Sequence, residues 1–243
     1  MNCRTTLIGP QRLLKGAPHV VRINGSIDAS SFGRFTHDFV AAVASGQRVI
    51  PVIIHSSGGN VVDAIGIANL IRGSPVPVAT IVPSIAQSAA ALILSAGTEG
   101  YRYAGPRATV MLHQVSLAGI SGSLSEVSAE TAELRRVNGE CCEMMAEYCK
   151  KPTDYFKNLT ALHRRDLYLN ASQAQAHNII NHVGIPKLEV RLHARLWLVN
   201  DEWRNLPAAP SERVVTVGGG GGGGGGGTKR KRDDDDDSDS DSD

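Results

Sequence analysis

The sequence predicts an α/β fold in which repeated β-α-β units build a mainly parallel sheet. Short apolar runs rich in valine and isoleucine alternate with segments whose apolar residues recur every three or four positions, as in amphipathic helices. Glycine or proline closes most of the helical segments. Strands that alternate with helices in this way pair in parallel, and their connections are expected to be right-handed.

The first half of the chain supplies two strands and two helices. HVVRINGSI (19–27) is expected as a strand that ends at Gly25, and residues 30–46 as a helix closed by Gly46. RVIPVIIHS (48–56) is expected as a buried strand, followed by a helix over 60–75. The residues expected to face inward on these helices are Phe32, Phe35, Phe39 and Val43, then Val62, Ile65, Ala68 and Leu70.

Two further strands and a helix follow. VPVATIVP (76–83) is expected as a strand, and Ser88–Ala96 as a helix that stops at Gly97. ATVMLHQV (108–115) is expected as the next strand, in which alternation places the His113 side chain on one face, close to the following loop.

Capping signals mark the last helices. A long helix is expected over 123–151, with Ser123 and Glu126 forming a capping box at its start. Asn170 and Gln173 are expected to cap a later helix in the same way.

Composition excludes several classes of protein. The chain has 243 residues, of which 42% are hydrophobic and 20% charged, as expected of a globular body. No apolar run reaches the roughly 18 residues of a membrane span, and the first residues lack the apolar core of a secretion signal. Four cysteines without a CxxC pair indicate neither a disulfide framework nor a metal site, so an intracellular, reducing compartment is expected.

The C-terminal end has a different character from the rest. Gly218–Gly227 is a run of ten glycines, which predicts a flexible linker over 218–227. Residues 228–243 carry first KRKR and then eight aspartates, so this basic-acidic tail is expected to be disordered. Without the tail the chain is only mildly basic, and no nucleic acid partner is expected.

The tail also bears on location. KRKR (229–232) fits a short nuclear import signal, with a merely solvated charge cluster in a cytoplasmic protein as the alternative. Ser238, Ser240 and Ser242 lie among aspartates, a setting that suits an acidophilic kinase.

Polar residues at the strand-to-helix junctions are the candidates for chemistry, because ligands of α/β sheets gather at the carboxyl ends of strands. Gly58 and Gly59 follow the strand 48–56, but a glycine pair alone indicates a tight turn. Ser88 alone is more typical of a helix cap than of a nucleophile. His113 alone would be structural, and Asp166 a surface charge.

Together, four segments resemble the Clp protease proteolytic subunit (ClpP) family. HSSGGN (55–60), AQSAAA (86–91), MLHQV (111–115) and DLYLNASQA (166–174) are similar to its NSPGG, AASMGA and MIHQP segments and to the Asp before an L-S-A helix start. Ser88 lies 29 residues after Gly59 and 25 before His113, which matches the family spacing. The resemblance covers 18–188 and leaves a divergent N-terminal segment over 1–17 and a C-terminal extension over 189–217.

The resemblance implies a serine endopeptidase that cleaves unfolded or extended polypeptides. It makes Ser88 the nucleophile, His113 the general base and Asp166 the residue that orients the imidazole, with Asp154 as the alternative acid. The backbone N–H groups of Gly59 and Ala89 would form the oxyanion hole. The residues implied to flank the substrate are Gly58, Asn60, Val61, Leu117 and Gly119.

The resemblance also implies the ClpP/crotonase fold with a long handle helix, and an assembly. Family members form heptameric rings, stacked in pairs through the handle helix, and an AAA+ unfoldase feeds them polypeptides. This chain has no Walker motif, so no cofactor is expected in it, and ATP would act only through a separate partner.

Three alternatives remain open at this stage. The chain could be a catalytically silent structural subunit, although the Ser, His and Asp are all retained. It could be an acyl-CoA hydratase or isomerase of the crotonase fold, although no suitable carboxylate pair is evident. A nuclear signal would also suit a divergent viral member that processes capsid or scaffold proteins without an ATPase.

Overall fold

The computed structural model describes residues 18–116, 119, 121–163, 166–187, 189–190 and 215–216. The chain divides into two compact units, 1–187 and 188–243. In the second unit, β9 (Glu189–Val190) pairs antiparallel with β10 (Val215–Thr216). The linker 218–227, the tail 228–243, the segment 1–17 and most of the extension 189–217 lie outside the described residues.

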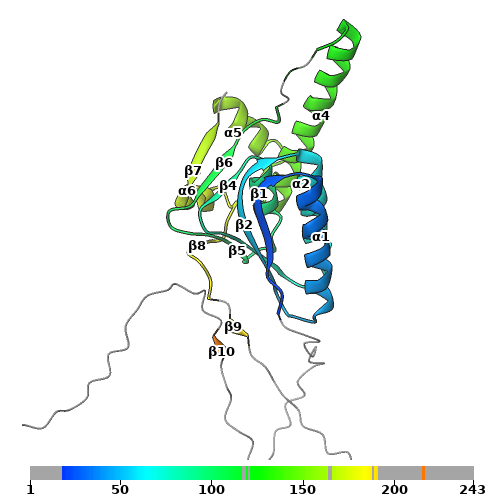
Figure 1. Ribbon diagram of the computed structural model, residues 1–243. Helices are drawn as coiled ribbons and strands as arrows, with labels where there is room; N and C mark the ends of the chain where they lie inside the picture. The colour runs from blue at the N-terminus through cyan, green and yellow to red at the C-terminus, as the bar shows by residue number, and fades with distance from the viewer. Residues whose placement is uncertain are drawn as a thin grey trace, which may run out of the picture. The chain divides into compact units, whose positions relative to one another are not determined.

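The first unit is built on an eight-stranded sheet (Figure 1). Its order is β7-β6-β4-β2-β3-β5-β8, and β1 pairs with β2. All these pairs are parallel except β6 with β7, which confirms the mainly parallel α/β prediction. The strands are β1 (Val21–Ile27), β2 (Ile50–Gly59), β3 (Val78–Val82), β4 (Ile85–Gln87), β5 (Arg102–Ala104), β6 (Thr109–Leu112), β7 (Leu167–Asn170) and β8 (His182–Val183).

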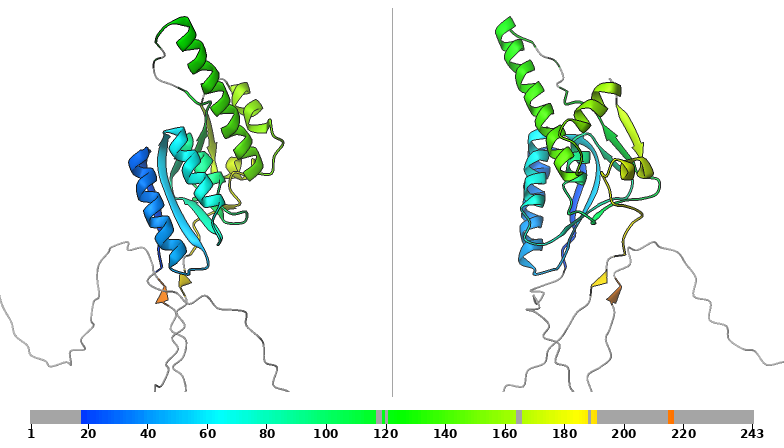
Figure 2. Two further views of the ribbon diagram at one scale, coloured as in Figure 1. Left: turned by 90° about the vertical axis from the view of Figure 1, so that its right-hand side faces the viewer. Right: turned by 180° about the vertical axis from the view of Figure 1, so that it is seen from behind.

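Six helices cover this sheet or extend from it (Figures 1 and 2). α1 and α2 lie side by side next to β1 and β2, α3 packs between α2 and α4, and α5 packs on α4. The helices are α1 (Ala29–Ala44), α2 (Val61–Arg72), α3 (Ala89–Ser95), α4 (Leu124–Tyr148), α5 (Tyr155–His163) and α6 (Ala171–Ala176).

The predicted helix faces are right for α1 and partly wrong for α2. In α1, Phe35 and Phe39 are buried and stack with ring centroids 5.2 Å apart. In α2, Val62 is 68% exposed instead of facing inward. The residues of α2 that are buried are Ala64, Ile67, Ala68 and Ile71. Because apolar residues lie on every side of this helix, periodicity alone does not identify its buried face.

Several boundaries differ from the prediction. β1 continues past Gly25, which has φ +79° and lies at a shift in register against β2, so this glycine forms a bulge instead of ending the strand. β6 ends at Leu112, which leaves His113 as the first residue beyond the strand. The short strands β4, β5, β7 and β8 were not predicted, because segments of two to four residues show too little pattern. The nine-residue helix α5 was not predicted either.

The predicted long helix is α4. Its capping box is confirmed: Glu126 N–H donates to Ser123 Oγ at 3.4 Å, and Ser123 N–H donates to Glu126 Oε2 at 2.7 Å. The N-terminal half extends away from the body in both views of Figure 2, and Leu124 there is 87% exposed. The C-terminal half is anchored by buried residues, which are Val137, Cys142, Met145, Ala146 and Tyr148.

A fully buried arginine fixes the C-terminal end of α4. Arg102 of β5 has 0% exposure and donates to the carbonyl oxygens of Tyr148, at 2.7 Å, and Ser95, at 3.1 Å. Its Nε donates to Asn181 Oδ1 at 3.0 Å. This one side chain therefore ties together β5 and the ends of α3 and α4.

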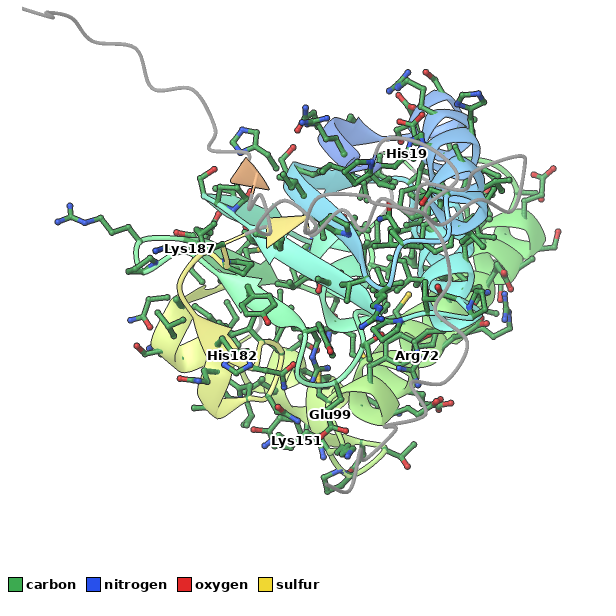
Figure 3. The ribbon with its side chains drawn as sticks, turned by 90° about the horizontal axis from the view of Figure 1, so that it is seen from below. His19, Arg72, Glu99, Lys151, His182 and Lys187 are labelled. Carbon is green, nitrogen blue, oxygen red and sulfur yellow. The ribbon has the colours of Figure 1, made fainter. Side chains whose placement is uncertain are left out.

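Polar contacts on the surface reinforce the same end of the body, which Figure 3 shows from below. The Arg72 guanidinium lies 4.9 Å from the centroid of the Tyr148 ring, and Glu99 forms an ion pair with Lys150. The C-terminal half of α4 is thus held rigidly against the sheet.

Candidate active site

Ser88 occupies a strained turn between β4 and α3. Its backbone has φ 55° and ψ −125°, a conformation that is costly for a residue with a Cβ. Its side chain makes no capping hydrogen bond to α3, so the interpretation of Ser88 as a helix cap is wrong. A sharp strand-to-helix turn of this kind directs a serine hydroxyl outward, although the GxSxG pattern associated with it is absent here.

The glycine pair at the end of β2, Gly58 and Gly59, makes room for this turn. A Cβ on Gly58 would lie 2.7 Å from Ser88 Cβ and 2.8 Å from the carbonyl oxygen of Gln87. A Cβ on Gly59 would lie 2.2 Å from the carbonyl oxygen of Ile27. Both glycines also have positive φ, which residues with a Cβ rarely adopt. Glycine is therefore required at both positions, by the backbone conformation and by close contact with the Ser88 turn on one side of β2 and with Ile27 on the other.

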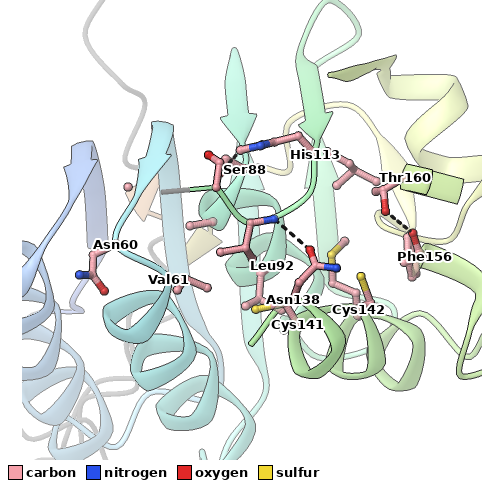
Figure 4. A pocket seen from close by; sticks show the side chains of 16 residues that line it. Asn60, Val61, Ser88, Leu92, His113, Asn138, Cys141, Cys142, Phe156 and Thr160 are labelled. Atoms are coloured by element: carbon pink, nitrogen blue, oxygen red, sulfur yellow. Dashed lines mark hydrogen bonds between the residues drawn. The ribbon is translucent and has the colours of Figure 1, made fainter. Parts of the chain in front are cut away.

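His113 lies next to Ser88 because β4 and β6 are parallel neighbours. Gln87 pairs with Met111, and the Ser88 N–H donates to the carbonyl oxygen of Met111 at 2.8 Å. His113 Nε2 lies 2.6 Å from Ser88 Oγ, within hydrogen-bonding distance (Figure 4). The structure therefore brings together the first two residues of the predicted triad.

The place of Asp166 follows from the antiparallel pairing of β6 with β7. Leu112 pairs with Leu167, so continuing the register by one residue puts Asp166 opposite His113. Within the described part of the chain, no hydrogen bond or ion pair joins these two side chains. The alternative acid, Asp154, accepts a hydrogen bond from Asn158 Nδ2 at 2.8 Å in α5.

A cavity of about 230 Å³ adjoins the Ser88–His113 pair (Figure 4). At its mouth lie Gly59, Asn60, Val61 and Ala89, all predicted for the oxyanion hole or the substrate. Gly58 instead packs behind Ser88, and the exposed Gly119 does not line the cavity. Leu117 lies outside the described residues.

The wall of the cavity comes from residues that sequence reasoning missed. They lie on α3, α4 and α5 and include Leu92, Asn138, Cys141, Cys142, Met145, Phe156 and Thr160. The available signal was an apolar, sulfur-rich face on the C-terminal half of the long helix. The resemblance to the family implies only contacts between rings for that helix.

The two cavity thiols are uncharged at neutral pH. Burial raises the pKa of Cys141 to about 12 and also raises the pKa of Cys142. The thiols therefore behave as apolar surface, and the cavity suits an uncharged, apolar side chain.

Neither a metal cluster nor a membrane-spanning helix is found in the part of the chain that the structure describes. No group of three or more His, Cys, Asp or Glu side chains there is placed to hold a metal ion. None of the helices described combines the length and the apolar character that crossing a bilayer requires.

Comparison with protein families agrees with this geometry. The model of the family described as Clp protease matches residues 11–187, nearly three quarters of the chain. The chain belongs to the Clp protease family. The resemblance drawn from four short motifs is thereby confirmed, and the α/β architecture is the one expected from it.

Curated relatives carry the same family name. The chain is 32% identical over 136 residues to the ATP-dependent Clp protease proteolytic subunit 2 of Corynebacterium diphtheriae, and equally to that of Corynebacterium efficiens. It is 33% identical over 138 residues to proteolytic subunit 3 of Nocardia farcinica. Each match takes in 56% of this chain but 66%, 66% and 61% of the relatives, so it spans less than two thirds of each.

Proposed function

We propose that this Clp-family chain is a serine endopeptidase that cleaves unfolded or extended polypeptides. The observation that supports this most directly is the 2.6 Å separation of Ser88 Oγ and His113 Nε2, on a strained turn at the mouth of a cavity. A nucleophile within hydrogen-bonding reach of its base is the arrangement that covalent acyl transfer requires.

In the proposed reaction, Ser88 Oγ attacks the carbonyl carbon of the scissile peptide while His113 Nε2 accepts the hydroxyl proton. The imidazolium then gives this proton to the leaving amine, which leaves an acyl-enzyme. A water molecule, deprotonated by His113, hydrolyses the ester and restores Ser88. Asp166, opposite His113 in the register of β6 and β7, would hold the imidazole in the required tautomer.

Two backbone groups would stabilise the oxyanion. Ala89 is the first residue of α3, and its N–H has no acceptor within the helix. Gly59 lies across the mouth of the same cavity. Each such donor contributes about 3 kcal/mol to transition-state stabilisation in well-studied hydrolases.

The substrate would bind as an extended strand. Asn60 and Val61 would flank it on one side, and the loop that contains Leu117 and Gly119 on the other. One apolar side chain of the substrate would enter the cavity between α3, α4 and α5.

The proposed partners are a polypeptide substrate, further copies of this chain and a separate AAA+ unfoldase. The copies would form a homo-oligomeric ring, either a heptamer or a stacked double ring. Stacking of two rings would cover the N-terminal half of α4, where Leu124 is 87% exposed. The relatives are named as ATP-dependent, whereas this sequence has no Walker motif. Mass measurement of the assembled particle tests the ring.

A nuclear location is proposed from KRKR (229–232). A fluorescent fusion of the full chain should concentrate in the nucleus, and a fusion lacking 228–243 should not. If the two fusions are distributed equally between nucleus and cytoplasm, the proposal is contradicted. The alternative, a cytoplasmic location with KRKR as a solvated charge cluster, would then hold.

Labelling of the serine tests the enzymatic proposal. A fluorophosphonate probe should label the wild type, and Ser88→Ala should abolish the label. Ser84→Ala is a matched control, because Ser84 Oγ also lies 2.6 Å from a histidine, His55, but does not line the cavity. Labelling that survives Ser88→Ala would refute the assignment, and a folded, assembled wild type without label would indicate a silent subunit.

The acid is tested by two matched substitutions. Asp166→Asn should slow labelling by up to about 10⁴-fold, the loss seen when a triad acid is made neutral. Asp154→Asn should leave the rate unchanged, because the Asp154 carboxylate is occupied by Asn158. The opposite pattern would transfer the role to Asp154.

A further inference from the structure

Asn138 of α4 makes a contact that the proposed mechanism does not use. Its side-chain oxygen Oδ1 accepts a hydrogen bond from the backbone N–H of Val115 at 2.9 Å (Figure 4). Val115 lies two residues after His113, and both Val115 and Asn138 line the cavity. The contact thus joins the middle of a long helix to the loop that follows the proposed base.

This loop has little other support near His113. β6 ends at Leu112, so the pairing of the sheet holds the chain only on the N-terminal side of the imidazole. On that side, Ser88 N–H also binds the carbonyl oxygen of Met111. On the C-terminal side, residues 113–116 belong to no helix or strand, and among the described residues the first backbone hydrogen bond is the one that Val115 N–H donates to Asn138.

The acceptor itself is well fixed. Asn138 follows the buried Val137 and precedes Cys142 by one helical turn, in the half of α4 that packs on the body. Because this half of α4 is anchored by buried side chains and packs on α3 and α5, the acceptor can restrain the loop.

We propose that Asn138 is a positioning residue that holds His113 against Ser88 through the Val115 backbone. This inference rests on the proposed peptidase function of the same site. It assigns to α4 a part in catalysis besides lining the cavity. Its physical basis is that small displacements of a catalytic group, on the order of 1 Å, cost up to about 10²-fold in rate.

Two substitutions separate the acceptor from the rest of the side chain. Asn138→Ala removes the acceptor, while alanine has the higher helix propensity and should not weaken α4. Asn138→Asp keeps an oxygen at the same distance along the side chain. Asn158→Ala is the matched control, since Asn158 is an exposed helical asparagine that does not line the cavity.

The experiment measures the rate of fluorophosphonate labelling, which depends on Ser88 and His113 and needs no large substrate. Asn138→Ala should be labelled about tenfold more slowly than the wild type, with an unchanged unfolding temperature. Asn138→Asp should recover to within about threefold of the wild-type rate, and Asn158→Ala should match the wild type. With a peptide substrate, Asn138→Ala should lower kcat more than it changes KM.

The outcomes distinguish this inference from the proposed function. If the wild type is labelled and folded Asn138→Ala is labelled equally fast, the positioning role is refuted and the peptidase proposal stands. If folded Asn138→Asp is as slow as Asn138→Ala, the acceptor is not what matters and the inference again fails. If Asn138→Ala does not fold, the labelling rate of folded Asn138→Asp tests the positioning role instead. A rate within about threefold of the wild type supports the role, and a rate about tenfold lower refutes it. A folded wild type that takes no label refutes the peptidase proposal itself.

Discussion

Replacing Gly58 with alanine probes the contact between the end of β2 and the Ser88 turn. The new Cβ would lie 2.7 Å from Ser88 Cβ, 2.8 Å from the carbonyl oxygen of Gln87 and 3.2 Å from the nitrogen of Ala89. Contacts under 3.0 Å force one side to move, and two of the three atoms are backbone. The φ of +99° is also one that residues with a Cβ rarely adopt.

The size of the effect follows from these two costs. An unfavourable backbone conformation costs about 1–3 kcal/mol, and overpacking costs about 1–3 kcal/mol more. Gly58→Ala should therefore destabilise the protein by roughly 2–6 kcal/mol, which lowers the unfolding temperature by about 5–20 °C for a domain of this size. Because Ser88 must shift relative to His113, fluorophosphonate labelling should slow by about 100-fold.

Gly33→Ala is the control. Gly33 lies exposed in α1, where a Cβ would meet nothing within 4 Å. Alanine in a helix is favoured over glycine, so this variant should be more stable by about 0.5–1 kcal/mol. Thermal unfolding and labelling rates of both variants are the assay. A Gly58→Ala protein with the stability and labelling rate of the wild type would refute the packing argument.

Two further predictions concern buried groups outside the site. Arg102→Met removes the donor to the carbonyl oxygens of Ser95 and Tyr148 and should cost about 3–5 kcal/mol in urea unfolding. Arg107→Met, at an exposed position, should change stability by less than about 0.5 kcal/mol, and equal effects of the two substitutions would contradict the role of the buried cation. Burial lowers the pKa of His177 from its ordinary 6.5. Below about pH 6.5 the unfolded state therefore binds more protons at this residue than the folded state does. The contribution of His177 to the free energy of unfolding is full above about pH 6.5 and falls as the pH drops from there toward the lowered pKa. His177→Gln should reduce the difference in unfolding temperature between about pH 7.5 and about pH 5.5, and an unchanged difference would show that another group is responsible.

The resemblance to the ClpP family, whose spacing Ser88 and His113 match, predicts this pair. The two residues follow neighbouring parallel strands, β4 and β6, so their separation of 25 positions is set by one helix and one intervening strand. The local pattern around Ser88 was misleading, because a serine before a helix is typical of a cap. Only the backbone, with φ 55°, shows that the hydroxyl turns toward His113 instead.

Other features depend on contacts that a sequence does not record. The pairing of β6 with β7 ends at Leu112 and Leu167, one residue short of His113 and Asp166. Its continuation would put these two residues opposite each other only because β7 runs antiparallel to β6, against the parallel order of the rest of the sheet. The cavity wall forms only where α4 and α5 pack together beside the Ser88 turn. The periodicity within α4 does not specify which neighbour its apolar face contacts. The error at Val62 has a similar cause, because apolar residues lie all around α2 and do not by themselves identify its inner face.

The sulfur atoms beside the nucleophile affect how inhibitors of this protein should be interpreted. Cys141 and Cys142 line the cavity that a substrate side chain would enter, so a maleimide or iodoacetamide group attached to either would block it. Such a reagent would then mimic the inhibition profile of a cysteine peptidase. Because burial raises both thiol pKa values, this alkylation should be slow at neutral pH and faster in alkaline solution. Inactivation by thiol reagents would thus report on the occupancy of the cavity, and only the site of covalent probe attachment identifies the nucleophile.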